Sequence, residues 1–192
     1  ALGRPGEGGQ TELSAELQLE LAVKAEHGLT AMTLVRVLSS PDELAAARRL
    51  QLEDRRARLN EPALALRLFY GGPKAHLERL LSEGFASSAP VEGAEFGAGW
   101  YFSKYASRAH LYNAGGSAVL LALVAIGNTE TVVRRDSRRR APSTGYDSII
   151  VPGRAHPFRD EAIPGRFSEE YVVFDQSQIL PLHLIEYEAT RC

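Results

Sequence analysis

Residues 95–102 read Glu-Phe-Gly-Ala-Gly-Trp-Tyr-Phe, a turn with two glycines that leads into three aromatic residues. Glycine permits tight turns and aromatic residues favour extended backbone, so this stretch predicts a short strand over 100–102. Similar apolar runs, separated by glycine-rich breaks, lie on both sides of it: 65–70, 119–126, 146–151, 171–174 and 182–187. Because these expected strands outnumber the helices and do not alternate with them, the pattern predicts an α+β fold with a mostly antiparallel sheet.

Three other segments have the spacing of helices. Three leucines share one face of a helix expected over 73–83. Ser40 with Glu43 three residues later has the order of a capping box, which predicts a helix from there to about residue 59. Apolar residues at every fourth position predict a further helix over 12–26, and the aliphatic stretch 33–38 predicts a strand after it.

The length and composition indicate one globular domain. The chain has 192 residues, of which 44% are hydrophobic and 24% charged, so disorder is excluded. Four glycines among the first ten residues indicate a linker, and we expect a tail with a short helix over 1–30 and the catalytic domain over 31–192. A net charge of −2 gives no reason to expect a nucleic acid or an anionic membrane as the main partner.

No membrane segment or metal site is expected. The longest apolar run, 119–126, is far shorter than the roughly 20 residues that span a bilayer, and the first residues lack the pattern of a secretory signal. We therefore expect an intracellular protein, in the cytoplasm or nucleus. The single cysteine is Cys192, and the five histidines lack the spacing of metal ligands, so we expect no metal.

A few short segments carry the chemistry. Gly71 and Gly72 follow an apolar strand directly, and glycine at a strand end lets a ligand approach the backbone closely. Tyr101 and Tyr112 can enclose a flat ring between them. The acidic pair before Tyr171 places a carboxylate at the start of a strand, where it can stabilise a developing cation.

In this order the segments resemble the catalytic domain of the poly(ADP-ribose) polymerase superfamily, the diphtheria-toxin-like ADP-ribosyltransferases. The resemblance covers about residues 33–187 and is closest to the smaller members that transfer single ADP-ribose units. The matching pieces are "LFYGG" at 68–72, "FGAGWYFS" at 96–103, "LLALVAIGN" at 120–128, "YDSIIV" at 146–151 and "EEYVVFDQSQILPLHLIEY" at 169–187. It implies a split β core with flanking helices.

The resemblance also implies an activity and roles for particular residues. The family cleaves the bond between nicotinamide and ribose in NAD and transfers ADP-ribose to an acceptor, here a protein or a nucleic acid. Glu170 matches the catalytic glutamate, which binds the ribose 2′-hydroxyl and stabilises the oxocarbenium-like transition state. Tyr101 and Tyr112 match the two aromatic residues that enclose nicotinamide, and Gly71 matches the glycine whose backbone holds the carboxamide.

Two positions depart from the family pattern. Tyr70 stands where the family usually has a histidine that binds a ribose hydroxyl, so the catalytic set is Tyr70, Tyr101 and Glu170. Ala109 stands where a serine usually binds the carboxamide. Each lost hydrogen bond costs about 1–3 kcal/mol. The alternative function is therefore that of an inactive pseudoenzyme that binds a partner through the same fold.

Three further alternatives stay open in the sequence. Tyr70 is either a core aromatic residue or a ligand contact. Glu169 and Glu170 are neighbours on a strand, so only one of them faces the site, and the position directly before Tyr171 favours Glu170. The five arginines within 134–140 form either a solvated loop or a patch that binds RNA or another polyanion.

Overall fold

The computed structural model describes residues 7–21, 23–24, 27–59, 64–113, 115–155, 162–164 and 169–192. In chain order the elements are α1 (Glu7–Glu20), β1 (Leu29–Ser39), α2 (Asp42–Ala57), β2 (Ala65–Tyr70), α3 (Lys74–Glu83), the 3-10 turn η2 (Phe85–Ser87), β3 (Trp100–Phe102), α4 (Ala106–His110), β4 (Ala118–Ala125), β5 (Thr129–Thr131), β6 (Ser148–Val151), β7 (Gly153–Ala155), β8 (Ala162–Pro164), β9 (Glu170–Val173), the 3-10 turn η3 (Gln176–Gln178) and β10 (Ile179–Arg191).

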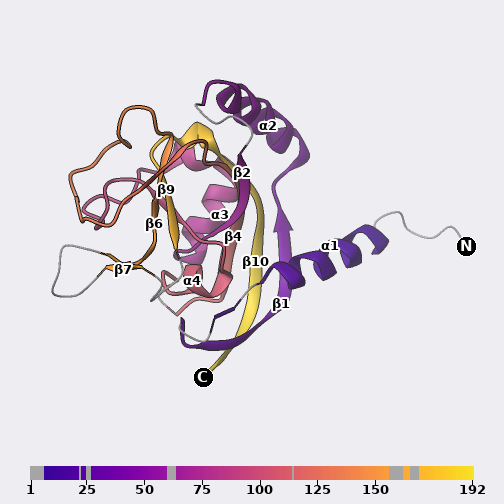
Figure 1. Cartoon of the computed structure of the whole chain (residues 1–192). Helices are drawn as coiled ribbons and strands as arrows, with labels where there is room; N and C mark the ends of the chain where they lie inside the picture. Colours follow the sequence, from indigo (N-terminus) through magenta and orange to yellow (C-terminus); the bar gives the residue numbers. More distant parts are fainter. Residues whose placement is uncertain are drawn as a thin grey trace, which may run out of the picture.

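The β core is divided into two four-stranded sheets. The first has the order β1-β10-β4-β2, and all its neighbouring strands are antiparallel. The second has the order β3-β9-β6-β5, and among its described strands β5 and β6 form the parallel pair. In Figure 1 the long β10 runs beside β1, and β6 and β9 lie to the left of the first sheet. The predicted α+β fold with a split, mostly antiparallel β core is confirmed.

The apolar run 119–126 forms β4, which lies between β10 and β2. All but one of the residues of β4 are buried. A strand that is covered on both faces needs apolar residues at every position, which explains why this run is continuous and does not alternate. The predicted bounds of β2 and β3 are those observed, whereas β10 extends well beyond the expected 182–187 at both ends.

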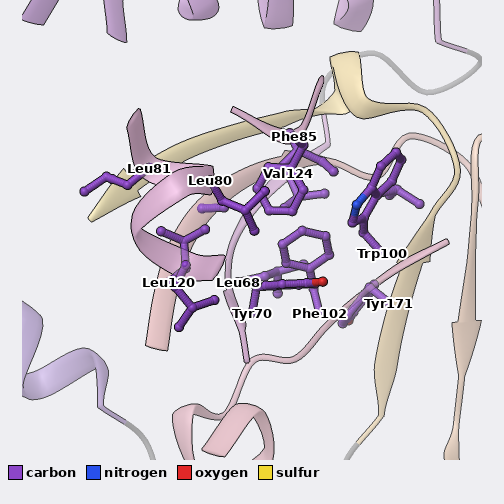
Figure 2. Packing of buried hydrophobic residues seen from close by; sticks show 14 of the residues in the cluster. Leu68, Tyr70, Leu80, Leu81, Phe85, Trp100, Phe102, Leu120, Val124 and Tyr171 are labelled. Atoms are coloured by element: carbon purple, nitrogen blue, oxygen red, sulfur yellow. The ribbon is translucent and has the colours of Figure 1, made fainter. Parts of the chain in front are cut away.

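The largest hydrophobic cluster lies between the first sheet, α3 and the second sheet. Leu77, Leu80 and Leu81 of α3 are all buried in it, which confirms the helix face predicted from their spacing. Figure 2 shows Leu80 and Leu81 on one side of this cluster and Trp100 on the other. A second cluster covers the opposite face of the first sheet, beneath α1 and α4. The helices thus flank the β core on both sides.

The predicted capping box at the start of α2 is wrong. Pro41 occupies the cap position, and no side chain there accepts a hydrogen bond from the helix. The Ser40 hydroxyl instead donates to the carbonyl oxygen of Leu81 at 3.4 Å. The Ser40 backbone amide donates to the carbonyl oxygen of Leu182 at 3.1 Å. Ser40 is buried, so its polar groups serve contacts that are distant in sequence.

Helix α1 starts at Glu7, five residues before the predicted start at residue 12. It ends at Glu20, six residues before the predicted end at residue 26. Leu17 and, just after the helix, Leu21 are buried in the second cluster, so this segment packs on the sheet. In Figure 1 α1 crosses in front of β1. That residues 31–192 form a catalytic domain by themselves stays a prediction.

The side chain of Gln18 covers part of the free edge of β1. Its Nε2 donates to the carbonyl oxygen of Met32 at 3.0 Å, and its Oε1 accepts from the amide of Leu34 at 2.6 Å. This pair of bonds imitates a neighbouring strand. Unpaired strand edges invite pairing with other chains, so Gln18 both stabilises β1 and protects its edge.

Replacing Gln18 by alanine is expected to lower the free energy of unfolding by about 1–2 kcal/mol, because two net hydrogen bonds are lost. Chemical denaturation measures the change. Gln51→Ala on the exposed face of α2 is the matched control and is expected to leave stability within about 0.5 kcal/mol. Equal stability of the two variants would show that water replaces the Gln18 contacts without cost.

Candidate active site

A bridge between the two sheets brings the end of β2 next to β3. The amide of Phe69 donates to the carbonyl oxygen of Ser103 at 2.7 Å, and the amide of Ser103 donates back at 3.0 Å. This bridge is antiparallel, so the same register places Tyr70 beside Phe102, and their ring centroids are 5.3 Å apart. Gly71, the residue after Tyr70, therefore follows β2 at the point where β2 lies next to β3.

Tyr101 is held by the glycine-rich turn that precedes it. Its hydroxyl donates to the carbonyl oxygen of Gly97 at 2.8 Å and accepts from the amide of Phe96 at 3.2 Å. Burial raises the pKa of Tyr101, and the negative charges of Glu170 and Glu95 act in the same direction, so the phenol stays neutral. The ring is therefore fixed without being charged.

Glu170 lies on the same face of the second sheet as Tyr101. Tyr101 pairs with Val172 across β3 and β9, and Glu170 is two residues before Val172 on the same strand. Glu170 is only 6% exposed. Its neighbour Glu169 has a different environment, because it contacts Lys104 at 3.0 Å and accepts from the Tyr171 hydroxyl at 2.8 Å.

The Glu170 carboxylate is bonded through both oxygens. Tyr112 donates its hydroxyl to Oε1 at 2.7 Å, and Arg108 Nη2 donates to Oε2 at 2.9 Å. Burial alone lowers the pKa of Arg108, but the charge and hydrogen bond of Glu170, together with contributions from Tyr112 and Glu95, outweigh it, so the net shift is upward. Burial and the same carboxylate raise the pKa of Tyr112. No sequence motif pointed to Arg108, because its partner lies 62 residues away.

Gly71 faces helix α4 at very close range. A Cβ atom on Gly71 would lie 1.9 Å from the carbonyl oxygen of Ala109, so only glycine fits there. Gly71 is partly exposed, and none of the hydrogen bonds among the described residues uses its amide or its carbonyl group. Ala109 itself is buried and carries no polar side chain. The free backbone groups of Gly71 can therefore bind a planar amide.

Asn113 fixes the turn that follows Gly71. Its Oδ1 accepts from the amide of Gly72 at 2.9 Å. Its Nδ2 donates to the carbonyl oxygen of Ala118 at 2.5 Å and to the hydroxyl of Tyr187 at 2.8 Å. This side chain links three segments that are distant in sequence, a role that sequence reasoning missed because a lone asparagine in a turn has no distinguishing signal.

Tyr70 is a core residue. It is 6% exposed, and its ring packs edge-on against Phe85 at a centroid distance of 5.4 Å. Figure 2 shows the Tyr70 ring among the labelled members of the main cluster, next to Phe102. Burial raises the pKa of Tyr70 to about 12. Its hydroxyl forms no hydrogen bond with any residue that the structure describes.

The arginine-rich segment 134–140 is joined to neighbouring loops by ion pairs. The pairs are Arg135–Glu95 at 3.2 Å, Arg139–Glu130 at 3.2 Å and Arg140–Glu92 at 2.9 Å. The carbonyl oxygen of Arg139 also accepts from the amide of Ala98 at 2.9 Å, within the turn that holds Tyr101. Because three of its five arginines form ion pairs with glutamates, we interpret the segment as a support for that turn rather than as a binding patch for polyanions.

The described part of the chain offers neither a cluster of residues for a metal ion nor a helix that could span a membrane. There, no three His, Cys, Asp or Glu side chains come together in an arrangement that can hold a metal ion. None of the helices in that part is both long enough and apolar enough to cross a bilayer.

The sequence model described as the poly(ADP-ribose) polymerase catalytic domain matches residues 18–189. The matched region includes Gly71, Tyr101, Tyr112 and Glu170. A comparison with curated proteins found no match.

Proposed function

Since the chain belongs to the poly(ADP-ribose) polymerase catalytic-domain family, whose members use NAD as substrate, we propose that it transfers single ADP-ribose units from NAD to a protein or nucleic-acid acceptor. The observation that carries this proposal is the meeting of three groups at one place. Gly71 lies against Ala109 of α4. The neighbouring Arg108 contacts the buried carboxylate of Glu170. Glu170 in turn lies on the same face of the second sheet as Tyr101.

In this proposal each group has one task. The amide and carbonyl groups of Gly71 bind the nicotinamide carboxamide, and the rings of Tyr101 and Tyr112 enclose the pyridinium ring. Glu170 accepts a hydrogen bond from the ribose 2′-hydroxyl and stabilises positive charge at C1′. The C1′–N bond breaks, and nicotinamide leaves with the electron pair. An acceptor oxygen, nitrogen or sulfur atom forms the new bond to C1′ and releases its proton to water.

The environment of Glu170 favours single units over chain growth. A carboxylate has about four lone-pair positions, and Tyr112 and Arg108 already use two. The 2′-hydroxyl of the donor takes a third. Elongation needs the same glutamate to receive a hydroxyl of the growing chain as well, and only the fourth position, on a carboxylate with two large neighbouring side chains, remains for it.

Tyr70 enters the proposal through its hydroxyl, which has no partner among the described residues. Replacing Tyr70 by phenylalanine is expected to weaken NAD binding about 3- to 10-fold, the value of one hydrogen bond, because the hydroxyl contacts the adenosine ribose. Nicotinamide alone is expected to bind unchanged, since it does not reach that position. Calorimetry with both ligands measures the difference, and unchanged NAD binding would restrict Tyr70 to a packing role.

The second candidate function is a pseudoenzyme, and specific contacts favour it. Both oxygens of Glu170 are engaged within the protein, and Ala109 offers no hydroxyl beside Gly71. A chain of this kind keeps the fold as a surface for a partner protein. It would bind NAD weakly and transfer nothing.

Incubation of the chain with NAD labelled in its adenylate half decides between the two functions. Lysate proteins and single-stranded oligonucleotides are supplied as acceptors, and products are separated on gels. We expect each modified acceptor site to carry one labelled ADP-ribose unit, so that cleavage of the product releases single ADP-ribose and no chains. Absence of transfer, together with weak NAD binding or none by calorimetry, would favour the pseudoenzyme. A ladder of longer products would contradict single-unit transfer.

A further inference from the structure

Arg108 is a nearly buried cation next to Glu170, and the roles given above leave it without a task. Its side chain is 11% exposed, and that of Glu170 is 8% exposed. Among the described residues the Arg108 Nε atom is buried without a hydrogen-bond partner. Desolvating a guanidinium group is costly, and surface pairs elsewhere in this chain avoid that cost. A cation in such a place points to a function at the carboxylate it contacts.

The three side chains form a closed set of contacts. Arg108 Nη2 contacts Glu170 Oε2 at 2.9 Å and the Tyr112 hydroxyl at 3.4 Å, while that hydroxyl donates to Glu170 Oε1 at 2.7 Å. The guanidinium carbon also lies 5.6 Å from the centroid of the Tyr112 ring. Two different oxygens of the carboxylate are therefore held from two sides, so its plane cannot rotate freely.

Resting on the proposed function, we propose that Arg108 is a positioning residue that fixes the orientation of the Glu170 carboxylate for the transfer step. A carboxylate that can turn about its own axis presents its lone pairs to the ribose 2′-hydroxyl only part of the time, whereas the transfer step needs them held in one direction. Arg108 prevents this rotation while it leaves one lone pair on each oxygen free. It acts through Glu170 and touches neither NAD nor the acceptor.

An opposite role is conceivable for the same contacts, and it makes an opposite prediction. If Arg108 and Tyr112 served to occlude Glu170, removing Arg108 would free the carboxylate and raise the rate. If Arg108 positions Glu170, the rate falls and the affinity for nicotinamide stays the same, because nicotinamide is held by Gly71 and the aromatic rings. The sign of the change in kcat therefore separates the two roles.

The test compares the chain with its Arg108→Gln and Arg108→Lys variants, and with Arg49→Gln on the exposed face of α2 as the matched control. Initial rates of transfer from labelled NAD give kcat and KM, and inhibition by nicotinamide gives its affinity. We expect Arg108→Gln to lower kcat about 10- to 100-fold with KM within about threefold, since displacing a catalytic group by about 1 Å costs that much. Arg108→Lys restores part of kcat, and Arg49→Gln changes nothing.

Thermal unfolding and circular dichroism establish that each variant is folded at the assay temperature. If Arg108→Gln does not fold, Arg108→Lys and Arg108→Met carry the same comparison. An unchanged or higher kcat in a folded variant overturns the positioning role and leaves the proposed function intact. A parent chain that neither binds nor cleaves NAD overturns the proposed function, and the positioning role with it.

Discussion

Replacing Glu170 by glutamine is expected to lower the rate of ADP-ribosyl transfer about 10²- to 10³-fold, the range found when a charge-stabilising group is removed from an active site. Glutamine has nearly the same size and keeps one acceptor oxygen, so the Tyr112 contact survives. The negative charge that stabilises C1′ in the proposed mechanism is lost. Initial rates with labelled NAD measure the loss, and it should appear in kcat more than in KM.

Glu169→Gln is the matched control, because it removes the adjacent carboxylate. Glu169 contacts Lys104 and Tyr171 and takes no part in the proposed site, so its loss should change the rate less than threefold. Glu170→Gln also leaves Arg108 without its anion, which can cost about 3–5 kcal/mol of stability for a buried pair. Unfolding is therefore measured beside activity. Equal losses of rate in the two variants would remove Glu170 from the mechanism.

The strands that contain apolar runs could be predicted because their signal is local, whereas the short β5, β7 and β8 contain no such run and were not predicted. The run 119–126 is apolar at every position since β4 has neighbours on both sides and cover on both faces. Because successive residues of a strand point to opposite faces, the sequence also predicts that Glu169, directly before β9, and Glu170, its first residue, have different partners, and they do. The periodicity and the composition of a short segment are enough to predict where a strand lies and which residues share a face.

Side-chain partners distant in sequence could not be predicted. Ser40 has the form of a helix cap, but its hydroxyl turns to Leu81, 41 residues away. Arg108 lies in a five-residue helix with no motif, and only the fold brings it to Glu170. In both cases the tertiary fold determines which partner a buried polar group contacts, so neighbouring residues in the sequence do not predict that partner.

Replacing Gly71 by alanine is expected to reduce stability by about 3 kcal/mol or more, beyond the usual cost of one added methyl group. The new Cβ would meet the Ala109 carbonyl oxygen at 1.9 Å and its carbonyl carbon at 2.8 Å. A backbone carbonyl cannot rotate away as a side chain can, so helix α4 must move as a unit. Because α4 carries Arg108, the same change should disturb Glu170 and lower transfer.

Gly72→Ala is the control that isolates this contact. A Cβ on Gly72 would lie 3.5 Å from His76 and 3.6 Å from Leu77, which is ordinary van der Waals contact. The hydrogen bond from the backbone amide of residue 72 to Asn113 Oδ1 is kept. Stability should change by less than about 1 kcal/mol, since alanine also restricts the unfolded chain. Denaturant unfolding and nicotinamide binding are measured for both variants. If Gly71→Ala were as stable as Gly72→Ala and still bound nicotinamide, the close approach of α4 would not be what requires glycine at position 71, and the carboxamide would bind elsewhere.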